Sequence, residues 1–475
     1  MSLLFKNTSI LNPDFSVSRG MDLRIEDARI VHIATSQEAC QGDSPCGTQA
    51  DLRATGTSCA AGGRRHIPSV PLARVIDGAH LLLIPAFYNA HTHTPMTLMR
   101  GYGENLRLQE WLGERIFPFE DKMTDEDVYY ASQLAFAEGF MHGVVSMSDH
   151  YFHSETIVRA AAACGVKLNI SRGLSFFDEL LDLTGFTPFQ ESKKLYYDNH
   201  DTLDGRIRVE IALHAEYTAT PSLIEAVSGL VHETGAPLHV HVSETQKEHE
   251  ECKERNGGRT PARVFADGGV FDNGGVAAHC VWITEEDADV LKEKGVSVVS
   301  CPDSNMKLAS GVIDAPMILE KGLNLALGTD GAASNNNFNF FEEIKLFEIG
   351  AKSRVGDPTV ISPQQALFAA TRGGALAQGR ADCGLLAEGM RADLIALDLT
   401  APAFEPLYDP AAALVYAASS RDIEMTVADG QIVYRRADGP AANSLPTVDL
   451  ERASFEVNRS KTRILGELAA EGLGQ

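Results

Sequence analysis

Eight apolar runs of strand length follow one another between about residue 80 and residue 332. They span residues 81–93, 143–150, 166–174, 208–216, 238–245, 275–281, 296–301 and 323–330. Amphipathic segments fill most of the gaps, and three of them end in a glycine that can stop a helix: 154–165, 221–235 and 284–295. Strand and helix that alternate eight times predict an α/β fold of the (β/α)₈ TIM-type barrel.

The two ends of the chain have a different pattern. Residues 1–79 and 385–445 contain short runs in which polar and apolar residues alternate, as in strands with one buried face. We therefore predict a small β-sandwich domain formed by both chain ends, beside a metal-dependent barrel of residues 80–384. Residues 36–74 are rich in Gly, Ser, Ala, Cys and Pro, which indicates an inserted surface loop. A C-terminal helix is expected within residues 446–475.

Composition limits the partners and the compartment. The formal charge is −24, and such a surface repels phosphate backbones, so no nucleic-acid partner is expected. The sequence contains no run of 18 apolar residues and no secretory pattern at its start, so no membrane association is expected. The eight cysteines are scattered without a Cys-x-x-Cys pair, which is typical of reduced, cytoplasmic proteins. Assembly into a homo-oligomer is left open.

Histidines and an aspartate stand at the ends of the predicted strands. His91 and His93 are two residues apart, so their side chains share one face of a strand. His241 lies in the fifth run with His239 on the same face but deeper, and Asp330 ends the eighth run. Because the C-terminal ends of barrel strands meet at one face, these side chains should converge. They suit one divalent metal ion with an open position, zinc first and iron as the alternative.

Further residues near these ends suit acid–base chemistry. His279 ends the sixth run and either binds the metal or polarises the attacking water. Asp330, flanked by glycines, suits both a weak metal ligand and a general base. Glu244 follows His241 by three residues and suits a carboxyl group that donates a proton. His214 ends the fourth run, where a two-metal site would need a bridging lysine, so a single metal is favoured.

The chain resembles the amidohydrolase superfamily, and within it the methylthioadenosine/S-adenosylhomocysteine deaminases. The resemblance covers about residues 76–445 through the motifs NAHTHTPMTLMRG, EWL, PFED, SRGL, HVSET, AAHCV, SNMKLASG and LGTDGAASNN. It implies metal ligands at His91, His93, His241 and Asp330, with His279 at the active site. It implies substrate contacts from Glu120, which would bind ribose hydroxyls, and from Arg172, His214, Glu244 and Asp330. Trp111 would be either an apolar wall beside the nucleoside or a core residue.

The chain departs from this family after Arg172. A second substrate arginine is expected about a dozen residues later, where SFFDELLDLTGFTPF has no basic residue. This stretch instead carries three acids that would repel a carboxylate: Asp178, Glu179 and Asp182. Lys193 or Lys194 could compensate. The amino-acid end of S-adenosylhomocysteine is therefore a doubtful ligand.

The expected function is metal-dependent hydrolytic deamination of adenine nucleosides of the adenosine, 5′-deoxyadenosine and methylthioadenosine type. Asp330 would take a proton from the attacking water, and Glu244 would protonate the ring nitrogen. A guanine, pterin or triazine aminohydrolase, or a chlorohydrolase, is the alternative with the same fold. A scaffold without activity is the alternative from another class.

Overall fold

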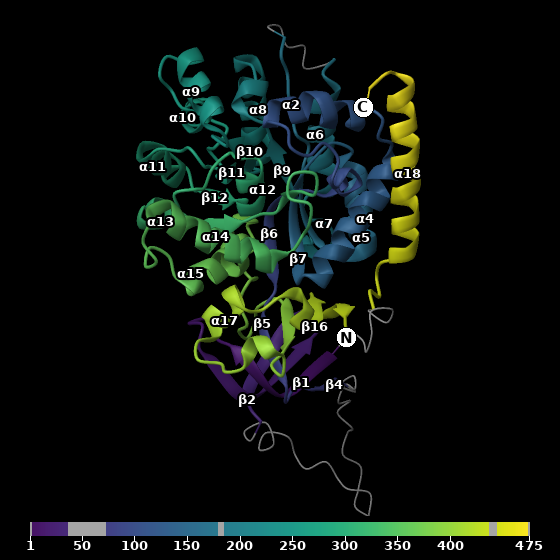
Figure 1. Ribbon diagram of the computed structural model, residues 1–475, viewed down its shortest axis with the longest axis vertical. Helices are drawn as coiled ribbons and strands as arrows, with labels where there is room; N and C mark the ends of the chain where they lie inside the picture. The colour runs from purple at the N-terminus through teal and green to yellow at the C-terminus, as the bar shows by residue number, and fades with distance from the viewer. Residues whose placement is uncertain (1, 37–72, 179–184, 437–443, 474–475) are drawn as a thin grey trace, which may run out of the picture.

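A closed ring of parallel strands forms the larger part of the protein, and a small sheet lies at one end of it (Figure 1). This computed structural model describes residues 2–36, 73–178, 185–436 and 444–473. The ring strands are β6 (Phe87–His93), β7 (Val144–His150), β8 (Lys167–Ser171), β9 (Ile207–Ala212), β10 (Leu238–Val242), β11 (Gly275–His279), β12 (Val296–Ser300), β13 (Leu325–Leu327) and β14 (Asp330–Gly331). β13 pairs with β12 and β14 pairs with β6, so these two pieces act as the eighth strand and close the ring. The predicted barrel is confirmed.

Helices cover the outside of the barrel between successive strands (Figure 1). They are α4 (Asp125–Met141), α5 (Ser154–Cys164), α6 (Thr187–Asn199), α8 (Pro221–Thr234), α9 (Gln246–Arg255), α10 (Pro261–Asp267), α11 (Glu285–Glu293), α12 (Pro302–Lys307), α13 (Ala315–Glu320) and α14 (Phe340–Val355). The three helices expected from sequence periodicity are present as α5, α8 and α11. Gly165 and Gly235 follow α5 and α8 with φ of 81° and 72°, the left-handed conformation that commonly ends a helix.

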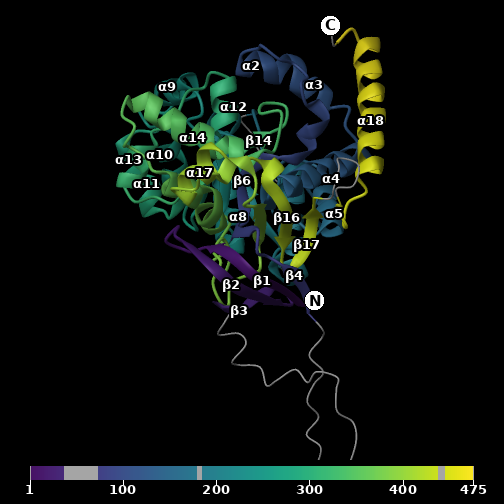
Figure 2. The same cartoon turned by 60° about the horizontal axis from the view of Figure 1, so that its bottom comes forward.

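Short helices lie above and below the ring. Those after β6 are η1 (Thr94–Met99), α2 (Leu108–Trp111), η2 (Leu112–Ile116) and α3 (Phe117–Glu120), and α2 and α3 lie at the end opposite the small sheet (Figure 2). The others are α7 (Thr202–Gly205), η3 (Glu216–Thr218), α15 (Pro363–Phe368), η4 (Ala369–Gly373), α16 (Gly374–Ala377), η5 (Pro402–Phe404), α17 (Pro410–Tyr416) and η6 (Ser420–Asp422). Gly374 lets α16 pack closely under the barrel, because a Cβ there would lie 2.3 Å from the carbonyl oxygen of Tyr88.

Both chain ends build the small sheet, as expected. Its strands are β1 (Ser2–Leu11), β2 (Val17–Glu26), β3 (Arg29–Thr35), β4 (Arg74–Asp77), β5 (Leu81–Pro85), β15 (Leu394–Asp398), β16 (Ile423–Ala428) and β17 (Gln431–Arg435). They run in the order β17-β16-β15-β5-β1-β2-β3, with β4 beside β1. The loop predicted for residues 36–74 lies almost wholly outside the described residues.

The run at 81–93, expected as one barrel strand, is two strands that belong to different sheets. The amide of Ala86 donates to Asp393 of the small sheet, whereas the amide of Phe87 donates to Gly143 of the barrel. The apolar pattern continues across the junction because both strands are buried, so hydrophobicity alone does not show the break.

β5 contributes to two hydrophobic cores at once. Leu81 and Leu83 pack in the core of the small sheet, and Leu82 and Ile84 pack in the core of the barrel. Because side chains alternate along a strand, one face of the sheet is its own core and the other face covers the barrel.

The last helix, α18 (Leu450–Ala470), lies along the side of the barrel (Figures 1 and 2). It packs against α4, and the guanidinium of Arg463 lies 2.5 Å from the carboxylate of Asp127 at the start of that helix. Among the described residues, no helix combines the length and the apolar character needed to cross a bilayer.

A buried lysine joins the barrel to the small sheet. Nζ of Lys167, at the start of β8, lies 2.6 Å from Oδ1 of Asp393 and 2.8 Å from Oδ1 of Asp429. All three side chains are buried. Burial lowers the pKa of Lys167, but the two aspartates raise it above the ordinary value, so the ammonium stays charged.

Replacing this lysine should destabilise the protein. Lys167→Met keeps most of the side-chain length but leaves the buried carboxylate of Asp393 without its cation, which costs about 3–5 kcal/mol, whereas Asp429 keeps Arg206 and Arg391. We expect a lower midpoint in urea unfolding. Lys194→Met is the matched control, because 63% of the Lys194 side chain is exposed, and its midpoint should equal that of the wild type. An unchanged midpoint for Lys167→Met would contradict this account of the junction.

Candidate metal centre and active-site pocket

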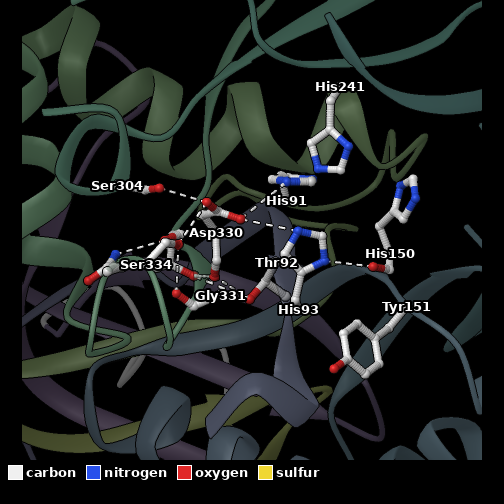
Figure 3. A network of polar contacts seen from close by, with 12 residues as sticks. His91, Thr92, His93, His150, Tyr151, His241, Ser304, Asp330, Gly331 and Ser334 are labelled. Atoms are coloured by element: carbon white, nitrogen blue, oxygen red, sulfur yellow. Dashed lines mark hydrogen bonds and ion pairs between the residues drawn. The ribbon is translucent and has the colours of Figure 1, made fainter. Parts of the chain in front are cut away.

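Five predicted residues converge at the C-terminal ends of the barrel strands. One ligand atom from each of His91, His93 and His241 lies within 4.8 Å of the other two, and the same holds for His91, His279 and Asp330. All five side chains are buried. The rings of His91 and His93 face the carboxylate of Asp330 across the mouth of the barrel (Figure 3).

The backbone at this mouth is unusual. Ser243, His279 and Asp330 have φ of 48°, 70° and 58°, in the left-handed region that non-glycine residues seldom occupy. Such conformations cost of order 1–3 kcal/mol each and cluster at functional sites. A glycine is required at 328, because a Cβ there would lie 2.7 Å from the carbonyl oxygen of His91.

Carbonyl acceptors fix the orientation of two of the rings. Nδ1 of His93 lies 2.6 Å from the carbonyl oxygen of His150, and Nδ1 of His241 lies 2.7 Å from that of His214. A carbonyl oxygen only accepts, so each Nδ1 carries a ring proton, and in the neutral form of each ring Nε2 then holds the lone pair.

The third ring has a free, buried nitrogen. Nε2 of His91 makes no hydrogen bond within the described protein, although it is fully buried. Burial lowers the pKa of His91 and His241 well below the ordinary value, so both rings are neutral. Metal ligation requires neutral imidazoles with a free lone pair. With the carboxylate of Asp330, the donor set suits zinc or iron.

Asp330 is held from both sides. Its Oδ1 lies 3.6 Å from Nε2 of His91 and 3.1 Å from Nε2 of His93. Its Oδ2 accepts hydrogen bonds from the hydroxyls of Ser304 at 2.6 Å and Ser334 at 2.8 Å. Burial raises its pKa, but its contacts with His91 and His93 hold that pKa well below its usual range. The carboxylate is therefore ionised.

A cavity of about 280 Å³ opens above the cluster. Its walls carry all the site residues expected from the sequence except His91, which lies beneath them: His93, Trp111, Glu120, Arg172, His214, His241, Glu244, His279 and Asp330. Trp111 thus lines the pocket and also packs in the hydrophobic core, with 5% of its surface exposed. The structure brings the predicted constellation together in one place.

Glu244 lines the pocket beside the histidine cluster. Its Oε2 is 3.8 Å from Nε2 of His279, and its Oε1 accepts from the hydroxyl of Ser310 at 3.3 Å. Burial raises the pKa of Glu244, which favours the protonated form. Glu248 fixes the turn that carries it, because its carboxylate accepts the backbone N–H groups of Ser243 at 2.9 Å and Glu244 at 2.8 Å.

Two further histidines have defined partners. The amide nitrogen of Asn305 lies 2.9 Å from Nδ1 of His279, so this amide donates and the ring proton of His279 is on Nε2, facing the pocket. Nδ1 of His214 lies 3.2 Å from the hydroxyl of Thr218, which itself donates to a backbone carbonyl. His214 therefore keeps an acceptor on Nε2, and burial lowers its pKa to about 4.

One wall of the pocket carries a partly buried carboxyl group. Glu120, at the end of α3, accepts a hydrogen bond from the hydroxyl of Tyr151 at 2.5 Å. Burial raises the pKa of Glu120 to about 7. Its second oxygen accepts no hydrogen bond from the described residues and is available to a ligand.

Arg172 is the only arginine or lysine among the described residues that line the pocket. It donates to Glu191 at 2.9 Å and to the carbonyl oxygen of Gly173 at 2.6 Å, so it is already engaged. The ammonium groups of Lys193 and Lys194 bind surface carboxylates instead. Of the three nearby acids, Asp178 does not line the pocket, and Glu179 and Asp182 lie outside the described residues.

The sequence analysis missed several residues of the site. His150 ends β7 among the metal-ligand rings, with its ring centroid 5.0 Å from that of His241, and neither of its ring nitrogens has a partner within the described protein. The rule that identified His91 and His93, a histidine at a strand end, also selects this residue. Ser304, Ser334 and Asn305 gave no such signal, because they contact the site from helices and turns.

Comparisons with known proteins agree with this geometry. The sequence profile described as "Amidohydrolase family" matches residues 82–433. The chain is 38% identical over 387 residues to 5-methylthioadenosine/S-adenosylhomocysteine deaminase of Dictyoglomus thermophilum, which covers 81% of this chain and 88% of the relative. It is 38% identical over 361 residues to 5′-deoxyadenosine deaminase of Methanothermobacter thermautotrophicus, which covers 76% and 84%. An adenosine deaminase from Xanthomonas campestris with bound zinc superposes with a TM-score of 0.84 at 28% identity, over 97% and 98% of the two chains.

Zinc should stabilise the metal-free protein through this cluster. An ion that binds only the folded state adds about 2.7 kcal/mol at 100 times its Kd, so Tm should rise. His241→Asn removes one of three imidazoles and should abolish the rise at the same zinc concentration. His232→Asn is the control, because the side chain of His232 is 54% exposed, and this variant should keep the rise in Tm. Equal shifts in the His241 variant and the wild type would place the ion elsewhere.

Proposed function

Because the chain belongs to the amidohydrolase family, we propose that it is a metal-dependent hydrolytic deaminase of adenine nucleosides. Its substrates are adenosine, 5′-deoxyadenosine and methylthioadenosine, and its products are ammonia and the inosine analogue. The observation that carries this proposal is the pocket itself, which places Glu120 on one wall and Glu244 and Asp330 beside the histidine cluster. The two relatives at 38% identity, a 5-methylthioadenosine/S-adenosylhomocysteine deaminase and a 5′-deoxyadenosine deaminase, support the same substrate class.

We assign one divalent ion to the site, with zinc first and iron as the alternative. Within the described residues, both groups of potential ligands share His91, which is consistent with a single centre. His214, not lysine, stands just beyond the end of β9, so a bridging lysine is absent from that position. A reducing, cytoplasmic setting is supported by the five described cysteines, all of which are free thiols.

The residues of the cluster divide the chemistry among them. An ion held by His91, His93, His241 and Asp330 would supply the Lewis acidity that brings the pKa of water toward ~7. Asp330 accepts the proton of the attacking water, because its carboxylate is ionised. His279 orients that water through the N–H of Nε2.

Glu244 completes the proton balance. Its carboxyl group protonates the adenine ring nitrogen next to the carbon under attack, so that negative charge does not build up on the ring. Asp330 then returns its proton to the departing amine, which leaves as ammonia, and the proton of the new hydroxyl group passes to Glu244 as the carbonyl of the product forms. Two carboxyl groups of one pocket with pKa values moved in opposite directions are the usual arrangement for an acid and a base.

The position of Glu120 favours a nucleoside over a free base as the substrate. A carboxylate accepts hydrogen bonds from two vicinal hydroxyls, as the ribose of a nucleoside offers. Without a sugar, Glu120 would remain partly buried with Tyr151 as its one hydrogen-bond donor. An unsatisfied buried polar group costs about 1–3 kcal/mol, so a guanine or triazine fits this wall less well.

The far end of the pocket supports a small or apolar 5′ substituent. Leu108, Leu112, Ile116, Phe117 and Phe152 line the pocket and are apolar. Arg172 is bound to Glu191, and no second arginine or lysine among the described lining residues is available for an α-carboxylate. A carboxylate in a pocket normally needs such a cation.

A substrate panel tests the proposed function. Ammonia release should be fastest with adenosine, 5′-deoxyadenosine or methylthioadenosine, with kcat/KM at least ~10-fold above S-adenosylhomocysteine and guanine, a difference of about 1.4 kcal/mol. Chloride release from atrazine, measured in parallel, should be slower by at least the same factor. Asp330→Asn should release no ammonia, which excludes a contaminating deaminase. Guanine or atrazine as the best substrate would favour the alternative function. S-adenosylhomocysteine ahead by tenfold would reveal a carboxylate-binding group that this pocket does not show.

The role of Glu120 predicts a pH dependence in KM. Its pKa of about 7 lies above the ordinary value. The ionised form, which can accept hydrogen bonds from two hydroxyl groups, therefore dominates only above pH 7. The KM for adenosine should therefore fall as pH rises from 6 to 8. In Glu120→Gln, KM should be higher and independent of pH, because the amide does not titrate. A wild-type KM that stays constant over this range would refute the assignment.

A further inference from the structure

A chain of buried polar side chains runs through the barrel lumen beneath the metal cluster. It consists of Arg380, Asn169, Glu210, His239 and His91, and we call it the lumen chain. Nη2 of Arg380 lies 3.0 Å from Oδ1 of Asn169, and Nδ2 of Asn169 lies 2.7 Å from Oε1 of Glu210. Nδ1 of His239 lies 2.8 Å from Oε2 of Glu210, and Nε2 of His239 lies 2.8 Å from Nδ1 of His91.

The lumen chain is shielded from solvent and from substrate. Its members are at most 3% exposed, and none of them lines the active-site cavity. Asn169 and Glu210 also line a second cavity, separate from the active-site cavity. With so little of their surface exposed, the polar atoms depend mainly on their neighbours in the chain.

The first two members fix the direction of these hydrogen bonds. A guanidinium only donates, so Oδ1 of Asn169 accepts from Arg380, and the Asn169 NH₂ group must face Glu210. Three backbone carbonyls, of Gly205, Leu168 and Arg206, hold the guanidinium in place. The amide of Asn169 therefore cannot turn over without losing its bond to Arg380.

The same reasoning fixes the direction of the next hydrogen bonds, from Glu210 through His239 to the metal ligand His91. The carboxylate of Glu210 accepts at both oxygens, so Nδ1 of His239 carries the proton that it donates. In the neutral ring, Nε2 of His239 is then an acceptor, and Nδ1 of His91 donates to it. The proton of His91 is thereby placed on Nδ1, and its Nε2 is the buried nitrogen that has no partner within the described protein.

We propose that Glu210 is a positioning residue for the metal centre, and that it acts through His239 to hold His91 in the tautomer whose Nε2 can bind the ion. The proposal rests on the metal site of the proposed function and not on its substrate. Residues that orient a ligand histidine in this way typically contribute ~10–100-fold to metal affinity.

Glu210→Gln is the decisive variant, because it reverses the direction of the hydrogen bonds between residue 210, His239 and His91. Asn169 still presents its NH₂ group, so the new amide must turn its oxygen to Asn169 and its own NH₂ group to His239. Nδ1 of His239 then becomes an acceptor, and its Nε2 donates to Nδ1 of His91. The proton of His91 moves to Nε2, where it blocks the lone pair that the ion needs.

The first measurement is the zinc Kd of the full-length, metal-free protein, by competition with a chelator. Glu210→Gln should weaken it ~10–100-fold. Ser146→Ala is the control, because Ser146 is equally buried in the lumen but bonds to Gln378, outside the lumen chain. The control should change the Kd less than about twofold, because the hydroxyl of Ser146 bonds to Gln378 and not to a metal ligand. Equal Kd values for the two variants would overturn the proposal.

The second measurement gives a decisive result without the Glu210 variant. Proton–nitrogen correlation spectra of protein with ¹⁵N-labelled histidine report which ring nitrogen carries the proton, and His91→Asn assigns the signal. The wild-type, metal-free protein should show His91 protonated on Nδ1, and Glu210→Gln should show it on Nε2. A wild-type His91 protonated on Nε2 would overturn the proposal even without the variant. Zinc binding with these signatures but no ammonia release from any nucleoside would instead refute the proposed function alone.

Discussion

The backbone pairing of Asp330 with Thr92 closes the barrel, and the arrangement of the site depends on it. This contact joins the last strand to the first, and the hydroxyl of Thr92 strengthens it by donating to the carbonyl oxygen of Asp330 at 2.8 Å. Thr92 lies between His91 and His93, so the pairing places the carboxylate beside both rings. The interruption of the eighth strand at 328–329 lets β13 pair on one side and β14 on the other. Residues distant in the sequence thereby become one cluster.

Burial gives the cluster its charge state, and hydrogen bonds decide which atoms remain free. The rings of His91 and His241 are neutral because they are desolvated, and Asp330 is ionised because two histidines and two serines bind it. Nδ1 of each metal-facing histidine donates a hydrogen bond, either to a backbone carbonyl or to another histidine ring. The surrounding protein thus presents three lone pairs and one negative charge to one point, which is the demand of a divalent ion.

The sequence predicted those parts of the site that obey a geometric rule. His91, His93, His241, His279 and Asp330 lie at strand ends, where parallel strands must bring them together. Glu120, Arg172 and Trp111 came only from the family resemblance, since short helices and loops above the barrel have no period to follow. The lumen chain gave no signal either: Asn169 and Glu210 are single polar residues in apolar strands, and their role depends on contacts across three strands. The break between β5 and β6 was missed because both strands are buried.

The central claim is that four strand-end residues hold one divalent ion at the floor of the pocket. Anomalous diffraction at the zinc absorption edge, on crystals of the zinc-loaded protein, tests it directly. The account predicts one strong peak in each chain, about 2.0–2.2 Å from Nε2 of His91, His93 and His241 and from a carboxylate oxygen of Asp330. Two peaks in the pocket, or a single peak bound by other residues, would contradict it.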